Sequence, residues 1–170
     1  MTAAPGADDV RLARPEDLSH LRGIEAAADE LYLTVGIGPF AEDAQEDHLS
    51  RAAVVFVSGT PPVGFASVEL VDGAAHIWQL SVLPSAGRQG RGTALVTAVC
   101  DWAAAAGYDA VTLTTFRDVP WNAPFYARLG FRAVTDLTPE LAEIRAHERA
   151  IGDDDFGPRL AMRKDLARPG

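Results

Sequence analysis

A strand, a turn rich in glycine and arginine, and a helix follow one another over residues 80–106, and no other stretch constrains the fold as strongly. The helix is predicted because apolar side chains recur at three- and four-residue intervals, at Leu95, Val99, Trp102 and Ala106. The turn over residues 87–93 holds three glycines, two arginines and no acidic residue. Glycines let the backbone approach a ligand closely, and N–H groups at a helix start bind anions. Two interpretations are open at this point: a phosphate-binding loop and an ordinary strand-to-helix turn.

The spacing of the glycines excludes two kinds of phosphate loop. No Gly-Lys-Ser/Thr triplet ends the turn, as a Walker A loop requires. The glycines from Gly87 to Gly92 fall as G-x-x-G-x-G, which is not the dinucleotide fingerprint G-x-G-x-x-G. The turn does fit the pattern Q-x-x-G-x-A, formed by Gln89, Gly90, Arg91, Gly92, Thr93 and Ala94. The predicted strand Leu80, Ser81 and Val82 precedes it.

This pattern resembles the acetyl-CoA pyrophosphate loop of the GNAT superfamily of N-acetyltransferases. A second motif, N-A-P-F-Y-A-R-L-G-F over residues 122–131, is similar to the family's N-x-x-A/P-x-x-x-Y-x-x-x-G-F region. The two motifs occur in the order expected for the family, and the resemblance covers roughly Val10 to Lys164. The resemblance implies an α/β fold, of the α+β type, with a mixed sheet. It also implies a single domain over residues 9–166, preceded by a flexible tail over residues 1–8.

The local patterns are consistent with that layout. Asp72-Gly73 is the strongest hairpin signal in the chain. Helices are predicted from Pro15 onward and over 41–52, 95–106, 123–129 and 138–150. Strands are predicted over 10–13, 53–58, 63–71, 75–83, 108–115, 131–134 and 158–164, the last of them at an edge of the sheet, where it would be available to pair with a second copy.

Composition limits the partners and the compartment. The 170 residues suffice for one domain with a full core, and 48% are hydrophobic. A net charge of −9 argues against nucleic acid or an anionic membrane as the main partner, and weakly favours a cationic substrate. With no signal peptide, no transmembrane stretch and one cysteine, Cys100, which we expect to be buried, the sequence favours the cytoplasm.

The resemblance also implies roles for particular residues. The loop Gln89–Ala94 would hold the coenzyme A pyrophosphate, with Arg88 and Arg91 at its rim. The backbone of Leu80, Ser81 and Val82 would bond the pantetheine arm and polarise the thioester carbonyl, and Asn122 would contact the arm. Tyr126 would protonate the departing thiolate, a role that suits a phenol with an ordinary pKa near 10. The alternative for Tyr126 is an aromatic residue that only packs.

The general base has two candidates. His76 shares a strand face with Trp78 and Leu80, similar to a histidine of arylalkylamine N-acetyltransferases, although Trp78 stands where those enzymes have a second histidine. The alternative is Glu69, acting through water, because Gln79 replaces a glutamate found in many relatives and an amide is no base. The other histidines, His20, His48 and His147, are expected to be exposed and to form no metal cluster.

The acceptor is the least determined part of the prediction. An acidic, aromatic pocket for a cationic amine is expected from Asp29, Glu30, Tyr32, Phe40, Trp78 and Trp121. The leading hypothesis is direct transfer of an acetyl group from acetyl-CoA to the primary amine of a small molecule, with no metal. Acetylation of a protein lysine or N-terminus, and a sensor that binds acetyl-CoA without turnover, remain alternatives.

Overall fold

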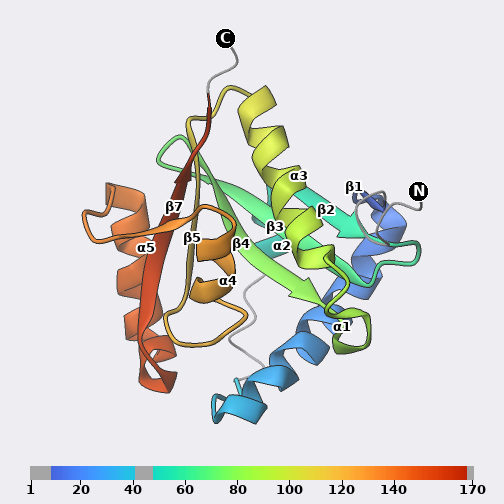
Figure 1. Cartoon of the computed structure of the whole chain (residues 1–170), viewed down its shortest axis with the longest axis horizontal. Helices are drawn as coiled ribbons and strands as arrows, with labels where there is room; N and C mark the ends of the chain where they lie inside the picture. The colour runs from blue at the N-terminus through green and yellow to red at the C-terminus, as the bar shows by residue number, and fades with distance from the viewer. Residues whose placement is uncertain (1–8, 41–47, 168–170) are drawn as a thin grey trace. The chain divides into compact units, whose positions relative to one another are not determined.

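The computed structural model describes residues 9–40 and 48–167 (Figure 1). Its elements in chain order are β1 (Val10–Leu12), η1 (Pro15–Asp17), α1 (Leu18–Asp29), η2 (Glu30–Val35), α2 (His48–Arg51), β2 (Val54–Ser58), β3 (Gly64–Val71), β4 (Ala74–Val82), η4 (Pro84–Ala86), α3 (Arg91–Ala105), β5 (Ala110–Phe116), α4 (Ala123–Arg128), β6 (Arg132–Val134), α5 (Pro139–Ala150), η5 (Asp153–Phe156) and β7 (Arg159–Asp165). The predicted tail, residues 1–8, and most of the helix predicted over 41–52 lie outside the described residues.

The strands form a mixed sheet in the order β1-β2-β3-β4-β5-β7-β6. The β4–β5 pair is parallel and joins Ala75 with Val111 and His76 with Thr112. The pairs β1–β2, β2–β3, β5–β7 and β6–β7 are antiparallel. This is the α/β mixed-sheet architecture that the sequence predicts.

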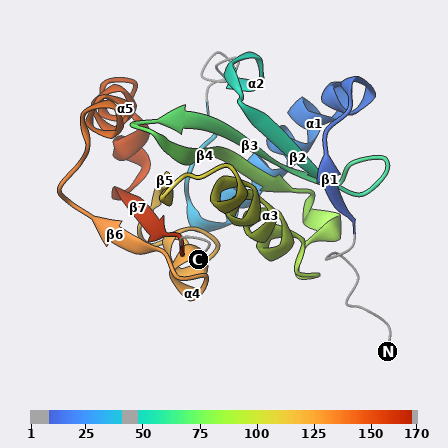
Figure 2. The ribbon, with the colours of Figure 1, turned by 90° about the horizontal axis from the view of Figure 1, so that it is seen from above.

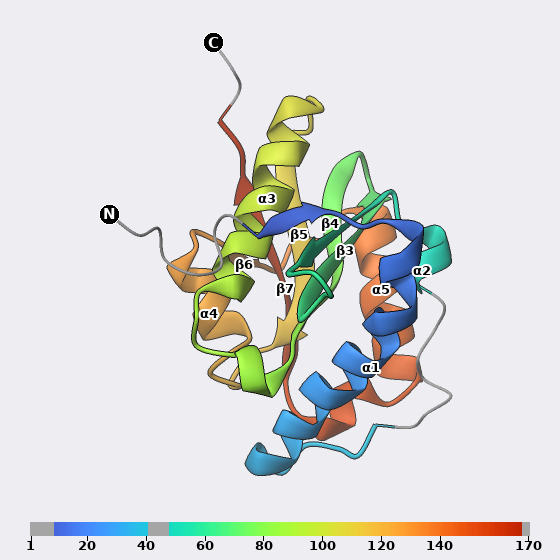
Figure 3. The same cartoon turned by 90° about the vertical axis from the view of Figure 1, so that its right-hand side faces the viewer.

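The chain divides into two compact units. The first holds the residues up to Glu69 together with Ile77–Asp101, and the second holds Leu70–His76 and the residues from Trp102 onward. In the first unit, Leu21 and Ile24 of α1 pack with Val57 of β2 and Phe65 of β3. Figure 3 shows the course of α1. Leu18, at the start of α1, is exposed, and so is Leu31 in η2.

The second unit is built around β5 and β7. Figure 1 shows β7 running beside β5, and their antiparallel register extends from Ala110↔Asp165 to Phe116↔Arg159. Helix α5 adds Leu141 and Ile144 to a cluster with Ala161. The prediction that the last strand lies at an edge is wrong: β7 lies between β5 and β6, and β6 is the edge strand at that end of the sheet (Figure 2). Strand order depends on long-range pairing, which the local pattern of residues 158–164 does not encode.

The Asp72-Gly73 hairpin turn is confirmed and has a second role. Both residues have positive φ, 51° and 73°, as a type I′ turn requires. The Asp72 carboxylate accepts hydrogen bonds from the backbone N–H groups of Glu140 and Leu141, at 3.1 and 3.0 Å. The turn therefore caps the start of α5, where these N–H groups have no partner within the helix.

Candidate active site

The loop predicted to bind pyrophosphate opens helix α3 in the first unit. Gly90 has φ 77°, a left-handed conformation that favours glycine, and a Cβ placed there would meet no atom within 4 Å. The Gly90 carbonyl accepts the bond from the Ala94 N–H at 3.0 Å, so the N–H groups of residues 91–93 precede the first bond of the helix. A helix start with this geometry offers several backbone donors to an anion.

The guanidinium of Arg91 has contacts that the sequence does not predict. It donates to Ser58 Oγ at 2.9 Å and to Gln89 Oε1 at 3.2 Å, and lies 3.5 Å from Asp9 Oδ2. These bonds tie the loop to the end of β2. Arg88, with φ 60°, is exposed.

Strand β4 leads into this loop and carries the residues predicted for the pantetheine arm. Ser81 is buried, and its Oγ accepts a bond from Gln79 Nε2 at 2.9 Å. A Cβ on Gly64 of β3 would stand 3.1 Å from the Ser81 carbonyl oxygen, so only glycine lets the two strands approach this closely. Leu80 and Val82 are partly buried.

Glu69 in the first unit is held by a contact that the sequence does not predict. Arg51 donates from Nε to Glu69 Oε1 at 3.1 Å, and its guanidinium carbon lies 5.2 Å from the centroid of the Trp78 ring. The other carboxylate oxygen, Oε2, is buried and has no hydrogen-bond partner among the described residues. A buried carboxylate oxygen without a partner is an unused proton acceptor.

His76, in the second unit, has a different environment. It is 1% exposed, and its Nδ1 lies 2.8 Å from Thr112 Oγ1. Burial lowers the pKa of His76 from 6.5 to about 4, although the negative charge of Glu148 acts in the opposite direction. The imidazole is therefore neutral at neutral pH.

The second unit also holds the N-A-P-F-Y motif. Asn122 precedes α4, and its Oδ1 accepts bonds from Thr115 Oγ1 at 2.6 Å and from the Phe116 backbone N–H at 3.4 Å. Tyr126 is 8% exposed, with its ring edge-on to Phe125 and Phe131 at centroid distances of 5.1 and 5.7 Å. Gly130 has φ 94° and ends the helix as predicted.

The predicted acceptor residues are only partly brought together. In the first unit, the rings of Tyr32 and Phe40 meet edge-on at 5.5 Å. Burial, and then the charge of Glu25, raise the pKa of Asp29 to about 6. Glu30 is exposed in the first unit, and Trp121 is 36% exposed in the second.

The prediction that His48 is exposed is wrong. His48 is buried, with 4% of its surface exposed, and it links two elements of the first unit. Its Nδ1 lies 3.1 Å from Ser67 Oγ, and its Nε2 lies 3.1 Å from Glu25 Oε2. The helical pattern around His48 gave no sign of burial because its partners lie on α1 and β3. His20 and His147 are exposed as predicted.

Two negative results concern residues 9–40 and 48–167 alone. No helix there is long and apolar enough to cross a membrane. The same residues contain no group of three or more His, Cys, Asp or Glu side chains placed to hold a metal ion. Cys100 is buried, as expected.

Comparison with known proteins decides the family. The model of the acetyltransferase (GNAT) family matches residues 20–131, which include parts of both compact units. The chain belongs to the GNAT family. It is accordingly an acyltransferase that uses acetyl-CoA as co-substrate.

Solved structures of GNAT proteins have the same fold. A GCN5-related N-acetyltransferase from Rhodopseudomonas palustris is 25% identical, with 98% of each chain covered and a TM-score of 0.65. The N-acetylglutamate synthase of Neisseria gonorrhoeae, complexed with coenzyme A and N-acetyl-glutamate, is 22% identical with a TM-score of 0.66; the match covers 94% of this chain and 35% of that one. The ribosomal-protein-S18-alanine N-acetyltransferase of Escherichia coli is 19% identical, with 95% of each chain covered and a TM-score of 0.64.

Proposed function

We propose that this GNAT protein transfers the acetyl group of acetyl-CoA directly to the primary amine of a small molecule, in a ternary complex. The observation that carries the proposal is the start of α3, where Gly90 takes a positive φ in open space and backbone donors precede the first helical bond. Such a helix start is suited to the coenzyme's pyrophosphate.

The first unit supplies the residues that hold and polarise the thioester. The N–H groups of residues 91–93 bind the pyrophosphate, and the backbone of Leu80–Val82 binds the pantetheine arm. A strand N–H aimed at the thioester oxygen stabilises the negative charge that develops there when the amine nitrogen attacks the carbonyl carbon. The carbon–sulfur bond then breaks and releases the coenzyme as a thiolate.

Two protons must move for the reaction to balance. The attacking amine loses a proton to a base, and the thiolate gains one from Tyr126. For the base we favour Glu69 over His76, because Glu69 Oε2 has no hydrogen-bond partner among the described residues, while His76 is 1% exposed and its Nδ1 lies 2.8 Å from Thr112 Oγ1. A general base must lie within hydrogen-bond reach of the amine, and an enclosed imidazole is less accessible to it.

The acidic side chains of the first unit support an acceptor that binds as a cation. Asp29, with its raised pKa, and Glu25 lie on the same helix. An ammonium group would stabilise the ionised form of such a carboxyl.

The proposal is tested by following thiol release from acetyl-CoA against small primary amines, neutral amines, and peptides with a lysine or a free N-terminus. We expect turnover on small cationic amines. Turnover on peptides alone would show that the protein is a protein acetyltransferase. The ribosomal-protein-S18-alanine N-acetyltransferase, which has a similar fold, is an enzyme of that kind. Acetyl-CoA binding without turnover on any amine would contradict the proposal in favour of a sensor.

A further inference from the structure

The two arginines of the predicted pyrophosphate loop have different surroundings. Arg88 is exposed, whereas the side chain of Arg91 is only 15% exposed. The Nη1 group of Arg91 donates to Ser58 Oγ at 2.9 Å and lies 3.5 Å from Asp9 Oδ2. Its Nε donates to Gln89 Oε1 at 3.2 Å. A guanidinium only donates hydrogen bonds, so Nε and Nη1 of Arg91 are already directed at acceptors of the protein.

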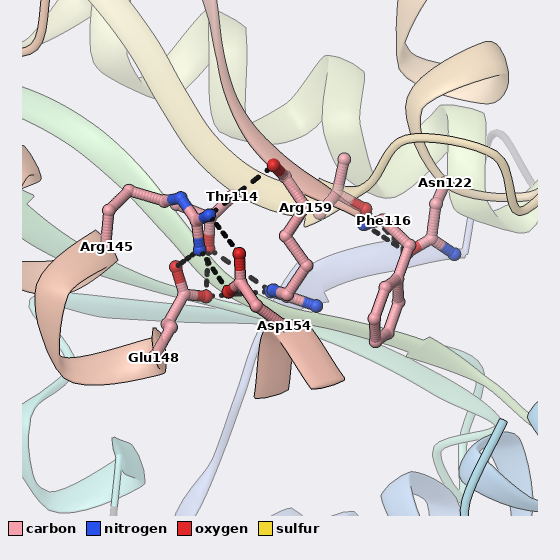
Figure 4. A network of polar contacts seen from close by, with 8 residues as sticks. Thr114, Phe116, Asn122, Arg145, Glu148, Asp154 and Arg159 are labelled. Carbon is pink, nitrogen blue, oxygen red and sulfur yellow. Dashed lines mark hydrogen bonds and ion pairs between the residues drawn. The ribbon is translucent and has the colours of Figure 1, made fainter. Parts of the chain in front are cut away.

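The partners of Arg91 differ from those of a buried arginine in the second unit. Arg145 donates to Glu148 Oε1 at 3.1 Å and to both carboxylate oxygens of Asp154, at 2.9 and 2.7 Å (Figure 4). Charged partners on this scale are typical of a structural ion pair. The shortest bond of Arg91 goes instead to an uncharged hydroxyl, and its carboxylate partner, Asp9, has a side chain that is 53% exposed. Because an exposed pair adds little to stability, we expect Arg91 to act on the loop more than on folding.

Ser58 gives Arg91 a fixed anchor in the sheet. It is the last residue of β2, is fully buried and lies opposite Gly64 in the β2–β3 register. The Ser58 carbonyl accepts a bond from the Val63 N–H at 2.8 Å. The Val63 carbonyl accepts in turn from the N–H of Leu83, which follows β4 and precedes the loop, at 2.8 Å. The end of β2 is therefore connected to the chain on both sides of the loop.

Arg91 also spans the glycine that opens the helix. Its Nε bond to Gln89 joins the two side chains that flank Gly90, whose φ is 77°. Gln89 and Gly90 are exposed, and the N–H groups of residues 91–93 precede the first bond of α3, from the Ala94 N–H to the Gly90 carbonyl. An exposed turn loses conformational freedom when it binds a ligand. Side chains that hold the turn in one conformation beforehand reduce that cost.

We propose that Arg91 is a positioning residue for the coenzyme: it braces the loop against Ser58 and presets the backbone N–H groups of residues 91–93 for the pyrophosphate. This inference rests on the proposed function, in which these N–H groups bind the pyrophosphate. Arg91 acts through the loop and takes no part in the acetyl transfer. Because the pantetheine arm is assigned to the backbone of Leu80–Val82, only the pyrophosphate end of the coenzyme should depend on Arg91.

The test compares acetyl-CoA with S-acetylpantetheine, which keeps the thioester and the arm but has no phosphate. Calorimetry measures the Kd for acetyl-CoA, and NMR titration measures the Kd for the smaller ligand. In Arg91→Gln, we expect the Kd for acetyl-CoA to rise about tenfold, as for the loss of a hydrogen bond to a charged group. The Kd for S-acetylpantetheine should stay the same, whereas a purely structural role would weaken the binding of both ligands.

Two variants separate the anchor from the charge. Ser58→Ala removes the acceptor but leaves the charge of Arg91, and the fully buried Ser58 has no surface on which to touch the coenzyme. We expect it to weaken the binding of acetyl-CoA and to leave that of S-acetylpantetheine unchanged. Arg91→Lys keeps the charge, but its donors lie on one atom and cannot hold both Ser58 and Gln89. It should show most of the loss seen in Arg91→Gln.

Arg11→Gln is the matched control. Arg11 is another partly buried arginine of the first unit, with a side chain that is 21% exposed. It donates to the Gly59 carbonyl at 3.2 Å and to Asp17 Oδ2 at 2.6 Å, and so joins the turn after β2 to η1 instead of to the loop. Arg11→Gln should leave both Kd values unchanged, whatever its effect on stability. Ser67→Ala, at an equally buried serine of β3, should do the same.

Full affinity for acetyl-CoA in both Arg91→Lys and Ser58→Ala would show that Arg91 acts by its charge on the phosphate, and would overturn the inference. Equal weakening of both ligands in Arg91→Gln would also overturn it. If the parent protein did not bind acetyl-CoA, the inference and the assignment of the loop would fall together. Binding without transfer to any amine would reject the proposed function alone, because the Kd comparison needs no acceptor.

Discussion

Tyr126 and Glu69 are placed so that their chemical roles can be separated by single-atom changes. Tyr126 is buried among aromatic rings. One carboxylate oxygen of Glu69 accepts from Arg51, and the other has no hydrogen-bond partner in the described part of the chain. The packing role and the catalytic role of a tyrosine differ only in whether the hydroxyl matters. An isosteric substitution distinguishes them.

Tyr126→Phe should lower kcat by roughly 100-fold, because general acid catalysis contributes about that much or more. The Kd for acetyl-CoA should stay the same, since the ring and its packing are kept. Steady-state kinetics and calorimetry measure the two quantities. Tyr108→Phe, at the ring contact with Trp102, is the control and should retain full activity. Unchanged kcat in Tyr126→Phe would leave Tyr126 as a packing residue.

Glu69→Gln should likewise reduce kcat by about 100-fold if Glu69 accepts the proton of the amine. Glu143→Gln, on the exposed side of α5, should have no effect. His76→Asn keeps a group able to bond Thr112 and should change kcat far less. The opposite order, with His76→Asn inactive and Glu69→Gln active, would assign the base to His76.

The residues that sequence patterns missed have partners far away in the chain. His48 reads as an exposed helical histidine, yet Glu25 and Ser67 bury it. Arg145 and Glu148 belong to a helix whose composition is polar, and both are buried through Asp154 and Arg159. Charged side chains are buried when they are paired. Local periodicity carries no information about such distant partners.

At the scale of elements, one turn both closes a hairpin and starts a helix. The Asp72 carboxylate accepts from two N–H groups of α5, and the Glu140 carboxylate accepts in return from the Asp72 N–H at 2.5 Å. Burial alone would raise the pKa of Asp72, but hydrogen bonds from Thr138, Glu140 and Leu141 outweigh it and lower the pKa. The hairpin signal was evident in the sequence; the cap on a helix 68 residues later was not.

Asp72→Asn should therefore destabilise the protein by about 1 kcal/mol at neutral pH, because the amide keeps one acceptor oxygen and replaces the other, which accepts from an N–H group of α5, by an NH2 group. Asparagine tolerates the positive φ, so the loss reports on the cap. The pKa of Asp72 is lower in the folded protein than in the unfolded chain. The ionised carboxylate therefore adds to the free energy of unfolding above the pKa of the unfolded chain, and this stabilisation is lost as pH falls through the pKa of the folded protein. Urea denaturation of the variant at neutral and acidic pH measures both. Asp136→Asn, exposed in the same unit, should have no such effect; an equal loss there would contradict the cap.

At the scale of the whole molecule, the local signals predicted the elements and the family resemblance predicted their arrangement. Strand–turn–helix spacing and the Asp-Gly hairpin were sufficient for β3, β4 and α3. The position of β7 inside the sheet was not predicted, because strand order depends on long-range pairing that the local pattern of residues 158–164 does not encode. Arg159 and Arg163 of β7 form ion pairs in the second unit.

Global stability should fall in acid because of His76. The pKa of His76 is about 4 in the folded protein and 6.5 for an ordinary histidine. The neutral imidazole therefore adds to the free energy of unfolding above pH 6.5, and this stabilisation is lost as pH falls toward 4. The loss is on the order of 3 kcal/mol. Denaturant unfolding of the parent across this range should show the decline, and His76→Asn should flatten it. The exposed His20→Asn is the control, and an identical decline in parent and His76→Asn would exclude His76 as its source.

The most direct test of the account is calorimetric titration of acetyl-CoA into the parent protein, Gly90→Ala and Gly107→Ala. Both glycines have positive φ and space for a Cβ, so both variants bear the same backbone strain, but only Gly90 opens the loop at the start of α3. We expect binding by the parent and by Gly107→Ala, and an affinity at least tenfold weaker for Gly90→Ala. No binding by the parent, or equal affinity in all three proteins, would contradict the assignment of this loop to the coenzyme.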